Sequence, residues 1–414
     1  MEGGCRTLNR LLQRLVYPLC QYSLLCTNPP YVRHHHLPSE RKQALQALVM
    51  QRLGMNVSGL SGLYVYFVLL ADALLADGGI ASWLLPAEFL YVNYGSVLRE
   101  YLSSRVTLLA MHHFNPDNVQ FDDALVSSCI ITYRKTRPAK DTSCEVSYGD
   151  YLAPEQRRSV PLSEFRMRNK WTLAHFENVE TFSGAPRLKD LFSVRRGIAT
   201  GANDFFIIDG ETATRYDIPK AFLKPILPSP RYLRESIIRA TADGRPDVPD
   251  PRYLLDCLLP PDVVRNHHPG LWSYLETGVA RGIPEGCLCA KKEVWYYQER
   301  RDAAPFLASY MGRSSNGRTC PIRFFVNFSD AIVTNGFLNL YPTAELAARL
   351  ENAPARMLEL GAALNNVPAE CVMQAGRAYG GGLHKIEPRE LLELQLPSVP
   401  DWLADASMPQ LALI

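Results

Sequence analysis

The sequence predicts an α/β fold for the first third of the chain and a mixed α+β domain for most of the remainder. Between Tyr22 and Lys135, short apolar runs typical of strands alternate with segments whose apolar residues recur at three-and-four spacing, as in helices. From about residue 136 the chain becomes rich in proline and charge, and then continues as short strands separated by many turns. With 414 residues, 47% of them hydrophobic, the chain is long enough for two or three domains.

In the first region, strands are predicted at residues 22–26, 80–85, 106–114 and 126–134, and helices at 43–53, 64–75 and 94–102. The glycines of Asp77-Gly78-Gly79 are expected to end the second helix. The last two strands are expected to form a hairpin at the edge of the sheet. The predicted domains are residues 1–135, a linker at 136–160, a second domain at 161–400 and a tail at 401–414.

Several classes of protein are not supported by the sequence. The longest apolar run, at 63–75, is interrupted by Asp72, and the N-terminus lacks the pattern of a secretory signal, so we expect a cytoplasmic protein without membrane contact. The ten cysteines are scattered, which favours reduced thiols. Cys287 and Cys289 with the preceding histidines match no standard zinc spacing, so no metal is expected.

The sharpest motif is Asn28-Pro29-Pro30-Tyr31, directly after the first predicted strand. The exocyclic amine of adenine is a weak nucleophile, and an asparagine oxygen together with the next carbonyl can accept its two hydrogens. The prolines stiffen the loop and remove competing donors, and Tyr31 offers a stacking face for an extruded base. A purely structural Pro-Pro turn capped by an aromatic residue is the alternative interpretation.

The loop and its surroundings resemble the gamma-type amino-methyltransferases, the N6-adenine DNA methyltransferases of restriction-modification and phage-defence systems. The resemblance extends to residues 63–67, to 78–90 and to Phe121 with the residues that follow it. It implies a partial class I (Rossmann-like) methyltransferase sheet followed by a target-recognition domain. It also implies that Asn28, Pro29, Pro30 and Tyr31 are catalytic, and that Tyr31 and Phe121 stack on the flipped base.

Two departures from the family pattern concern the methyl donor. The family often has an acidic residue before the Leu-Tyr pair, where this chain has Ser61-Gly62. Only 27 residues precede the Asn-Pro-Pro-Tyr loop, and Gly3-Gly4-Cys5 follows no strand. We therefore expect the donor-binding residues to be mostly absent from this chain, and expect it to bind donor poorly unless an N-terminal fragment is supplied.

Basic residues between Arg157 and Arg196 are interleaved with aromatic ones, which suits a phosphate-contacting surface, although a solvated face would look the same. The downstream region resembles target-recognition domains at residues 188–206, 223–227, 295–313 and 379–388. The resemblance implies that DNA is bound by Arg195, Arg196, Lys189, Arg313 and Lys385.

The leading functional hypothesis is a site-specific DNA methyltransferase that moves a methyl group from S-adenosylmethionine to the exocyclic amine of a flipped adenine. The expected partners are double-stranded DNA and a separate N-terminal methyltransferase fragment or a nuclease subunit. Two alternatives remain at this point. One is a catalytically inactive or split DNA-binding or specificity subunit, and the other is a protein-glutamine methyltransferase, whose substrate amide presents a similar nitrogen.

Overall fold

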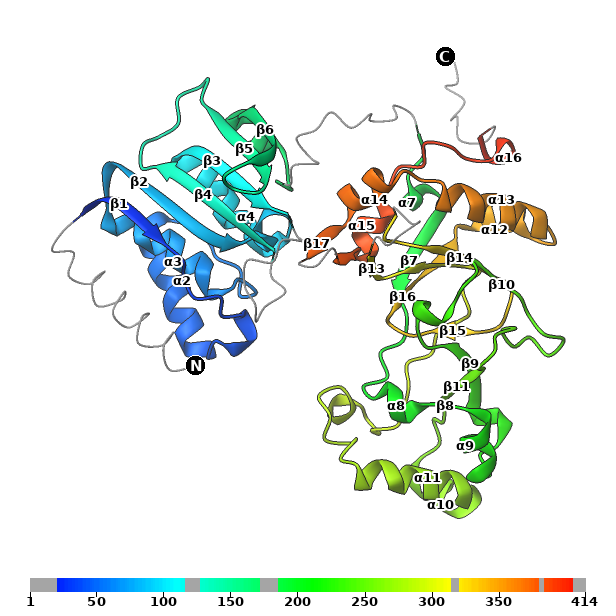
Figure 1. The fold of residues 1–414 in the computed structure, drawn as a ribbon. Coiled ribbons are helices and arrows are strands. Elements are labelled where there is room, and N and C mark those ends of the chain that lie inside the picture. Colours follow the sequence, from blue (N-terminus) through cyan, green and yellow to red (C-terminus); the bar gives the residue numbers. More distant parts are fainter. Residues whose placement is uncertain (1–20, 116–126, 172–184, 314–319, 380–382, 405–414) are drawn as a thin grey trace, which may run out of the picture. The chain divides into compact units, whose positions relative to one another are not determined.

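The computed structural model describes residues 21–115, 127–171, 185–313, 320–379 and 383–404, and it divides into two compact units (Figure 1). The first unit comprises Met1–Thr181 with Ala378–Gly382, and the second comprises Phe182–Arg377 with Leu383–Ile414. Each unit has its own hydrophobic core.

The first unit contains a six-stranded sheet with the order β1-β2-β4-β3-β5-β6. The strands are β1 (Tyr22–Thr27), β2 (Leu75–Pro86), β3 (Thr107–Phe114), β4 (Ser128–Arg134), β5 (Ser143–Gly149) and β6 (Pro154–Pro161). β1 is parallel to β2 and β3 is parallel to β5, while the remaining pairs are antiparallel. The carboxyl ends of β1, β2, β3 and β5 therefore lie at one end of the sheet.

The helices of the first unit pack onto this sheet through a large apolar core. They are η1 (His34–His36), α2 (Ser39–Leu53), α3 (Leu63–Leu70), η2 (Ala71–Leu74), η3 (Ala87–Leu90), η4 (Asn93–Gly95), α4 (Ser96–Glu100), the π-helical η5 (Tyr101–Arg105) and α5 (Leu162–Met167). α2 ends at Gly54, whose φ of 65° suits the left-handed conformation of a helix C-cap. All eight residues of α3 are buried, which explains why this segment reads as a continuous apolar run.

Three expectations for this region differ from the structure in detail. Residues 77–79 do not end a helix but lie inside β2, because Gly78 and Gly79 exchange backbone hydrogen bonds with Lys135 beyond the end of β4. The hairpin of β3 and β4 is confirmed, but it does not form the sheet edge. The segment expected to be a linker, 136–160, instead contains β5 and most of β6, because Cys144 and Val146 alternate with exposed residues and bury one face.

The second unit contains two sheets, with the orders β10-β14-β12-β16-β7 and β15-β9-β11-β8, and the antiparallel strand pair β13-β18. The strands are β7 (Phe192–Arg196), β8 (Ile207–Ile208), β9 (Leu223–Leu227), β10 (Ile237–Ile238), β11 (Arg252–Leu255), β12 (Phe306–Ser309), β13 (Met311–Arg313), β14 (Phe324–Asn327), β15 (Ile332–Val333), β16 (Phe337–Pro342) and β18 (Leu383–Lys385). The short strand β17 (Arg377–Tyr379) crosses the boundary between the two units along the chain.

Its helices are α7 (Leu188–Leu191), α8 (Asn203–Phe206), α9 (Gly210–Arg215), η6 (Lys220–Phe222), η7 (Pro230–Tyr232), α10 (Pro261–His267), α11 (Pro269–Ala280), η8 (Cys289–Lys291), α12 (Ala344–Leu350), α13 (Pro354–Asn365), α14 (Ala369–Ala375), α15 (Pro388–Leu392) and α16 (Asp401–Ala404). Figure 1 shows α12 and α13 beside the five-stranded sheet, and α10 and α11 together at the other end of this unit.

The expected fold class, an α/β sheet followed by a mixed α+β domain, is confirmed. Among the described residues, no helix is both long and apolar enough to cross a bilayer.

Candidate functional site

The Asn-Pro-Pro-Tyr loop begins where β1 ends. Thr27, the last residue of β1, pairs with Trp83 of β2, so Asn28 is the first residue beyond the carboxyl end of the strand. Asn28 is exposed, Pro29 is buried and Pro30 is partly buried. The amide of Asn28 is therefore accessible, while the following proline anchors the loop in the protein.

Two hydrogen bonds hold this loop against neighbouring elements. The hydroxyl of Tyr31 donates to the carbonyl of Leu84 in β2 over 3.0 Å. The backbone N–H of Leu63, at the start of α3, donates to the carbonyl of Val32 over 2.9 Å. Burial raises the pKa of Tyr31 above its usual range, so the hydroxyl stays protonated and remains a donor.

The residues before α3 are closely packed against the same loop. A Cβ on Gly62 would lie 3.3 Å from the carbonyl oxygen of Val32, so a larger residue would press on the backbone of the loop. Ser61 is fully buried, and its hydroxyl donates to the carbonyl of Tyr94 over 3.0 Å. The Ser61-Gly62 pair, a departure from the family pattern, thus has a packing role in this chain.

Sequence reasoning missed a buried histidine at the same end of the sheet. His113, near the carboxyl end of β3, has its Nε2 3.2 Å from the hydroxyl of Ser127. Burial, with a smaller contribution from neighbouring His112, lowers the pKa of His113 to about 4, so its imidazole is neutral at neutral pH. The adjacent pair His112-His113 near the end of a predicted strand is the feature of the sequence that could have indicated this buried histidine.

The predicted stacking residue Phe121 lies outside the described residues. The segment that contains it is bounded by Asn115, directly after β3, and by Ser127, directly before β4. The carbonyl of Ser127 accepts a 2.7 Å hydrogen bond from the N–H of Ala87, directly after β2. Both flanking residues therefore lie at the end of the sheet where Asn28 also lies.

Two of the five predicted DNA-binding residues share one aromatic ring in the second unit. The guanidinium of Arg196 lies 3.9 Å from the centroid of the Tyr310 ring, and the Lys385 ammonium lies 4.9 Å from it. The Tyr310 hydroxyl donates to Glu387 over 2.7 Å, and Lys385 pairs with Glu387 over 3.0 Å. Burial alone would raise the pKa of Glu387, but the hydrogen bonds from Tyr310 and Lys385 bring it below the ordinary value.

The other three predicted residues lie on neighbouring elements. Arg195 is exposed on β7, and Arg313 is exposed on β13, where its partner across the sheet is Leu383 of β18. Lys189 is paired with Glu393 over 3.1 Å, and Arg187 is paired with the same carboxylate over 2.6 Å. The Lys189 charge is therefore partly balanced within the protein.

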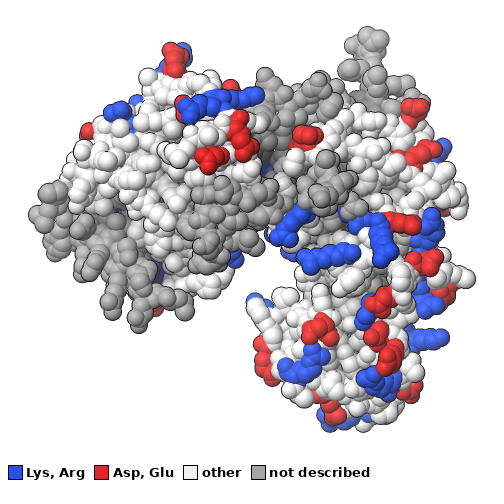
Figure 2. All heavy atoms as spheres, in the orientation of Figure 1, with Lys and Arg blue, Asp and Glu red and all other residues white. Residues whose placement is uncertain are grey.

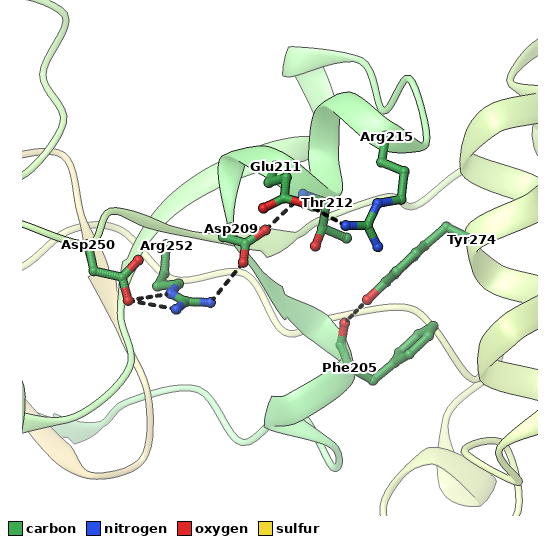
Figure 3. Close-up of polar contacts among 8 residues, drawn as sticks. All are labelled: Phe205, Asp209, Glu211, Thr212, Arg215, Asp250, Arg252 and Tyr274. Carbon is green, nitrogen blue, oxygen red and sulfur yellow. Dashed lines mark hydrogen bonds and ion pairs between the residues drawn. The ribbon is translucent and has the colours of Figure 1, made fainter.

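Acidic and basic residues are not spread evenly over the second unit. Figure 2 shows blue side chains gathered over the middle of this unit, whereas its end near α10 and α11 carries blue and red side chains mixed together. One such mixed group appears in Figure 3, where Arg252 pairs with Asp250 over 2.6 Å and with Asp209 over 3.4 Å. Asp209 also accepts from the N–H of Thr212, which caps α9 and lowers the pKa of Asp209.

In the part of the chain that the structure describes, no three His, Cys, Asp or Glu side chains are grouped as metal ligands. Cys287 is exposed, and Cys289 is buried with its thiol directed at the carbonyl of Thr200.

An Asn-Pro-Pro-Tyr loop with an exposed Asn28 at the carboxyl end of a parallel strand, followed by a separate unit with a basic face, agrees with the restriction-modification methyltransferases that the family models identify. The model for the C-terminal domain of the type II methyltransferase M.Eco57I matches residues 167–412, and the model for the Eco57I restriction-modification methylase matches residues 20–120. The chain belongs to the M.Eco57I family of type II methyltransferases.

Individual relatives agree with this assignment. The chain is 28% identical to type II methyltransferase M.XamI of Xanthomonas campestris pv. amaranthicola over 382 residues, which cover 90% of this chain and 67% of the relative. It is 24% identical to M.AccI of Acinetobacter calcoaceticus over 402 residues, covering 92% and 71% respectively. The fold is similar to that of MmeI, solved in complex with DNA, with a TM-score of 0.52 and 14% identity. That match covers 81% of this chain but only 43% of MmeI.

Proposed function

We propose that this protein methylates the exocyclic amine of adenine in duplex DNA, with S-adenosylmethionine as the donor, within a restriction-modification or phage-defence system. The observation that carries the proposal is the position of Asn28. Its amide is exposed directly after a parallel strand, on a loop that Tyr31 and Val32 tie to two neighbouring elements.

Asn28 is proposed to act on the amine of the target base. Its side-chain oxygen and the carbonyl of Pro29 accept the two amine hydrogens, which leaves the nitrogen lone pair available for attack on the donor methyl group. Pro29 and Pro30 have no N–H that could compete for these acceptors. Because the loop is held in place before the base arrives, little conformational entropy is lost on binding.

Tyr31 and Phe121 are proposed to stack on a base that has left the helix. The hydroxyl of Tyr31 is already bonded to Leu84, so the ring is fixed at one end and offers a stable face. The two residues that flank the segment of Phe121 lie at the same end of the sheet as Asn28, which is compatible with this role.

The donor must bind beside the loop, and the described residues do not supply a complete pocket for it. In the described part of the chain, β1 pairs with β2 alone, and no Gly-rich turn follows a strand at this end of the sheet. Leu24 on β1 is 63% exposed. We propose that further strands carrying the donor loop pair with the open side of β1. In their absence the chain would act as a DNA-binding or specificity subunit.

The second unit is proposed to hold the DNA. Arg195, Arg196, Arg313 and Lys385 contact phosphates, and Lys189 adds to them when the DNA displaces Glu393. Phosphate contacts of this kind fix the register of the duplex so that the target base meets the loop.

The product of the reaction tests the proposal. Duplex DNA incubated with the protein and S-adenosylmethionine, with a donor-binding fragment added if the chain alone is inactive, is digested to nucleosides and analysed by mass spectrometry. N6-methyladenine is expected. N4-methylcytosine would refute the adenine assignment, and a methylated glutamine in a protein substrate would refute the DNA assignment.

Calorimetry distinguishes a chain that needs further strands to bind S-adenosylmethionine from a chain that binds it alone. Weak or undetectable binding of S-adenosylmethionine to the 414-residue chain is expected, with tight binding after addition of a fragment that supplies the strands proposed to pair with β1. Tight stoichiometric binding to the chain alone would show that the donor pocket is already complete.

A further inference from the structure

A short loop in the second unit presents an exposed aromatic side chain between two arginines. The loop contains η7 (Pro230–Tyr232) and connects β9 to β10. Tyr232 is 74% exposed, the largest exposure among the large hydrophobic residues described in this unit. Arg231 and Arg234 on either side of it are also exposed. A single exposed aromatic ring is ordinary on a protein surface, so a role for Tyr232 depends on the rigidity of the loop and on the charges beside the ring.

The backbone of this loop is firmly held even though its side chains are exposed. Leu233 is buried in a core cluster with Phe325 and Phe337. The guanidinium of Arg323 donates to the carbonyl of Leu233 over 2.7 Å and also reaches the carbonyls of three other loop residues: Pro230, Arg234 and Glu235. The same guanidinium lies 4.5 Å from the centroid of the Phe325 ring. One arginine thus fixes the conformation that presents Tyr232.

The two arginines beside Tyr232 differ from the others in this part of the unit. Most exposed or partly exposed arginines nearby are paired with a carboxylate at 2.5 to 3.0 Å: Arg215 with Glu211, Arg239 with Glu235, Arg245 with Asp243, Arg252 with Asp250 and Arg281 with Asp204. Among the described residues, the side chains of Arg231 and Arg234 form no ion pair. Their charges are therefore available to an external anion.

A cavity of about 990 Å³ opens beside the loop, and Tyr232 and Arg234 form part of its wall. Other parts of the wall are Arg252, Asp247 and Asp250, so the cavity offers donors and acceptors together rather than a uniformly positive surface. Arginine donors and carboxylate acceptors are groups that read the edges of guanine and cytosine, respectively. This composition suits bases better than phosphates.

We propose that the loop of residues 229–235 is a DNA-reading element. Tyr232 packs against a base of the recognition sequence, Arg231 and Arg234 bind the phosphates on either side, and Arg323 acts as the positioning residue for the loop. The inference rests on the proposed function, since it requires that the second unit binds duplex DNA. An aromatic ring held on a rigid loop loses little conformational entropy on contact, which makes it an effective wedge or stacking partner.

Photocrosslinking of the full 414-residue chain tests the contact directly. The probe is a pool of random-sequence 30-base-pair duplexes in which 5-iododeoxyuridine replaces thymidine, because this base crosslinks preferentially to aromatic side chains stacked on it. A crosslinked peptide containing Tyr232 is expected, and Tyr232→Leu should remove this crosslink. Binding of the pool without any crosslink at Tyr232 would overturn the inference while leaving DNA binding by the second unit intact. Failure to bind the pool at low salt would overturn the DNA-binding proposal and the inference with it.

Affinity measurements on matched variants give an independent test. Tyr232→Ala is expected to weaken binding of the duplex pool by about tenfold, whereas Val279→Ala, which truncates another exposed apolar residue, should leave it unchanged. The slope of log K against log salt is negative, and Arg231→Gln and Arg234→Gln should each reduce its magnitude by about 0.9. Arg215→Gln, which replaces an exposed arginine paired within α9, should leave the slope unchanged. Equal effects of the loop variants and their controls would contradict the proposal.

The role of Arg323 is tested by a conservative variant. Arg323→Lys retains a cation that can donate to some of the four carbonyls, so it should keep part of the affinity and of the Tyr232 crosslink, whereas Arg323→Met should lose both. If Arg323→Met lowers thermal stability but keeps the crosslink at its original yield, Arg323 does not position the loop.

Discussion

The loop at the end of the first sheet and the basic face of the second unit are built by different means. Asn28, Tyr31 and His113 are neutral, and their surroundings consist of backbone carbonyls, a serine hydroxyl and apolar side chains. The second unit instead places Arg196 and Lys385 on one aromatic ring and balances them with Glu387. The first region is suited to placing one small group accurately, and the second to attracting a polyanion whose position is set by many contacts. The two regions should therefore respond differently to mutation, pH and salt.

The largest expected effect is that of Asn28→Ala on methylation. Because the lost oxygen is the group proposed to act on the reacting amine, the methylation rate should fall 100-fold or more, on the scale of losing one preorganised polar group. DNA affinity should change less than twofold. Tritium transfer from S-adenosylmethionine at saturating DNA measures the first effect and fluorescence anisotropy the second. Asn366→Ala, at an exposed asparagine of the second unit, is the control. Methylation within a few fold of wild type would refute the role of Asn28.

Acid should destabilise the first unit through His113. The folded state lowers the pKa of His113 from 6.5 to about 4, so the unfolded chain binds the proton more tightly. This contribution to stability is complete above pH 6.5 and is lost as pH falls toward 4, amounting to about 3 kcal/mol. Hydrogen exchange in β3 and β4 as a function of urea and pH measures it, after correction for intrinsic exchange rates. His113→Gln should flatten the pH dependence, and an unchanged profile would contradict the assignment.

Salt should weaken DNA binding by the second region if the proposed phosphate contacts are made there. Arg196→Gln and Lys385→Gln should each reduce the slope of log K for DNA against log salt by about 0.9 and weaken binding several fold at physiological salt. Anisotropy titrations between 50 and 300 mM salt, roughly the range over which such contacts are screened, measure both quantities. A slope equal to that of wild type would place the phosphate contacts elsewhere on the molecule.

The smallest expected effect is a gain in affinity on removing Glu393. Lys189 and Arg187 hold the pKa of Glu393 below its ordinary value, so this carboxylate is charged at neutral pH and competes with phosphate for both cations. Glu393→Gln should tighten DNA binding by less than about threefold, because exposed ion pairs contribute little. The same titrations test this, and weaker binding by the variant would show that Glu393 helps to position the two cations.

Much of the first unit could be predicted from local sequence patterns. The strand before Asn28, the buried run at α3 and the β3–β4 hairpin each have a distinct periodicity or a turn signal. The Asn-Pro-Pro-Tyr loop was recognisable because the constraints of proline and the acceptors of asparagine are properties of the residues themselves. Local patterns did not predict the strands at 136–160. This Pro- and charge-rich segment was expected to be a linker, but it adds β5 and β6 to the sheet. Strand pairing over long sequence separations leaves little trace in the segment itself.

The sequence by itself determined which residues are candidates for chemistry, Asn28 to Tyr31 and the basic side chains of the second unit, since the motif and the family resemblance depend only on the order of residues in the chain. Only the tertiary structure decided which of them are available. It bonds Lys189 to Glu393, places Arg196 and Lys385 on Tyr310, and exposes Tyr232 on a loop that Arg323 holds from 90 residues further along the chain. The physical reason is that exposure, ion pairing and burial depend on neighbours brought together from distant parts of the chain.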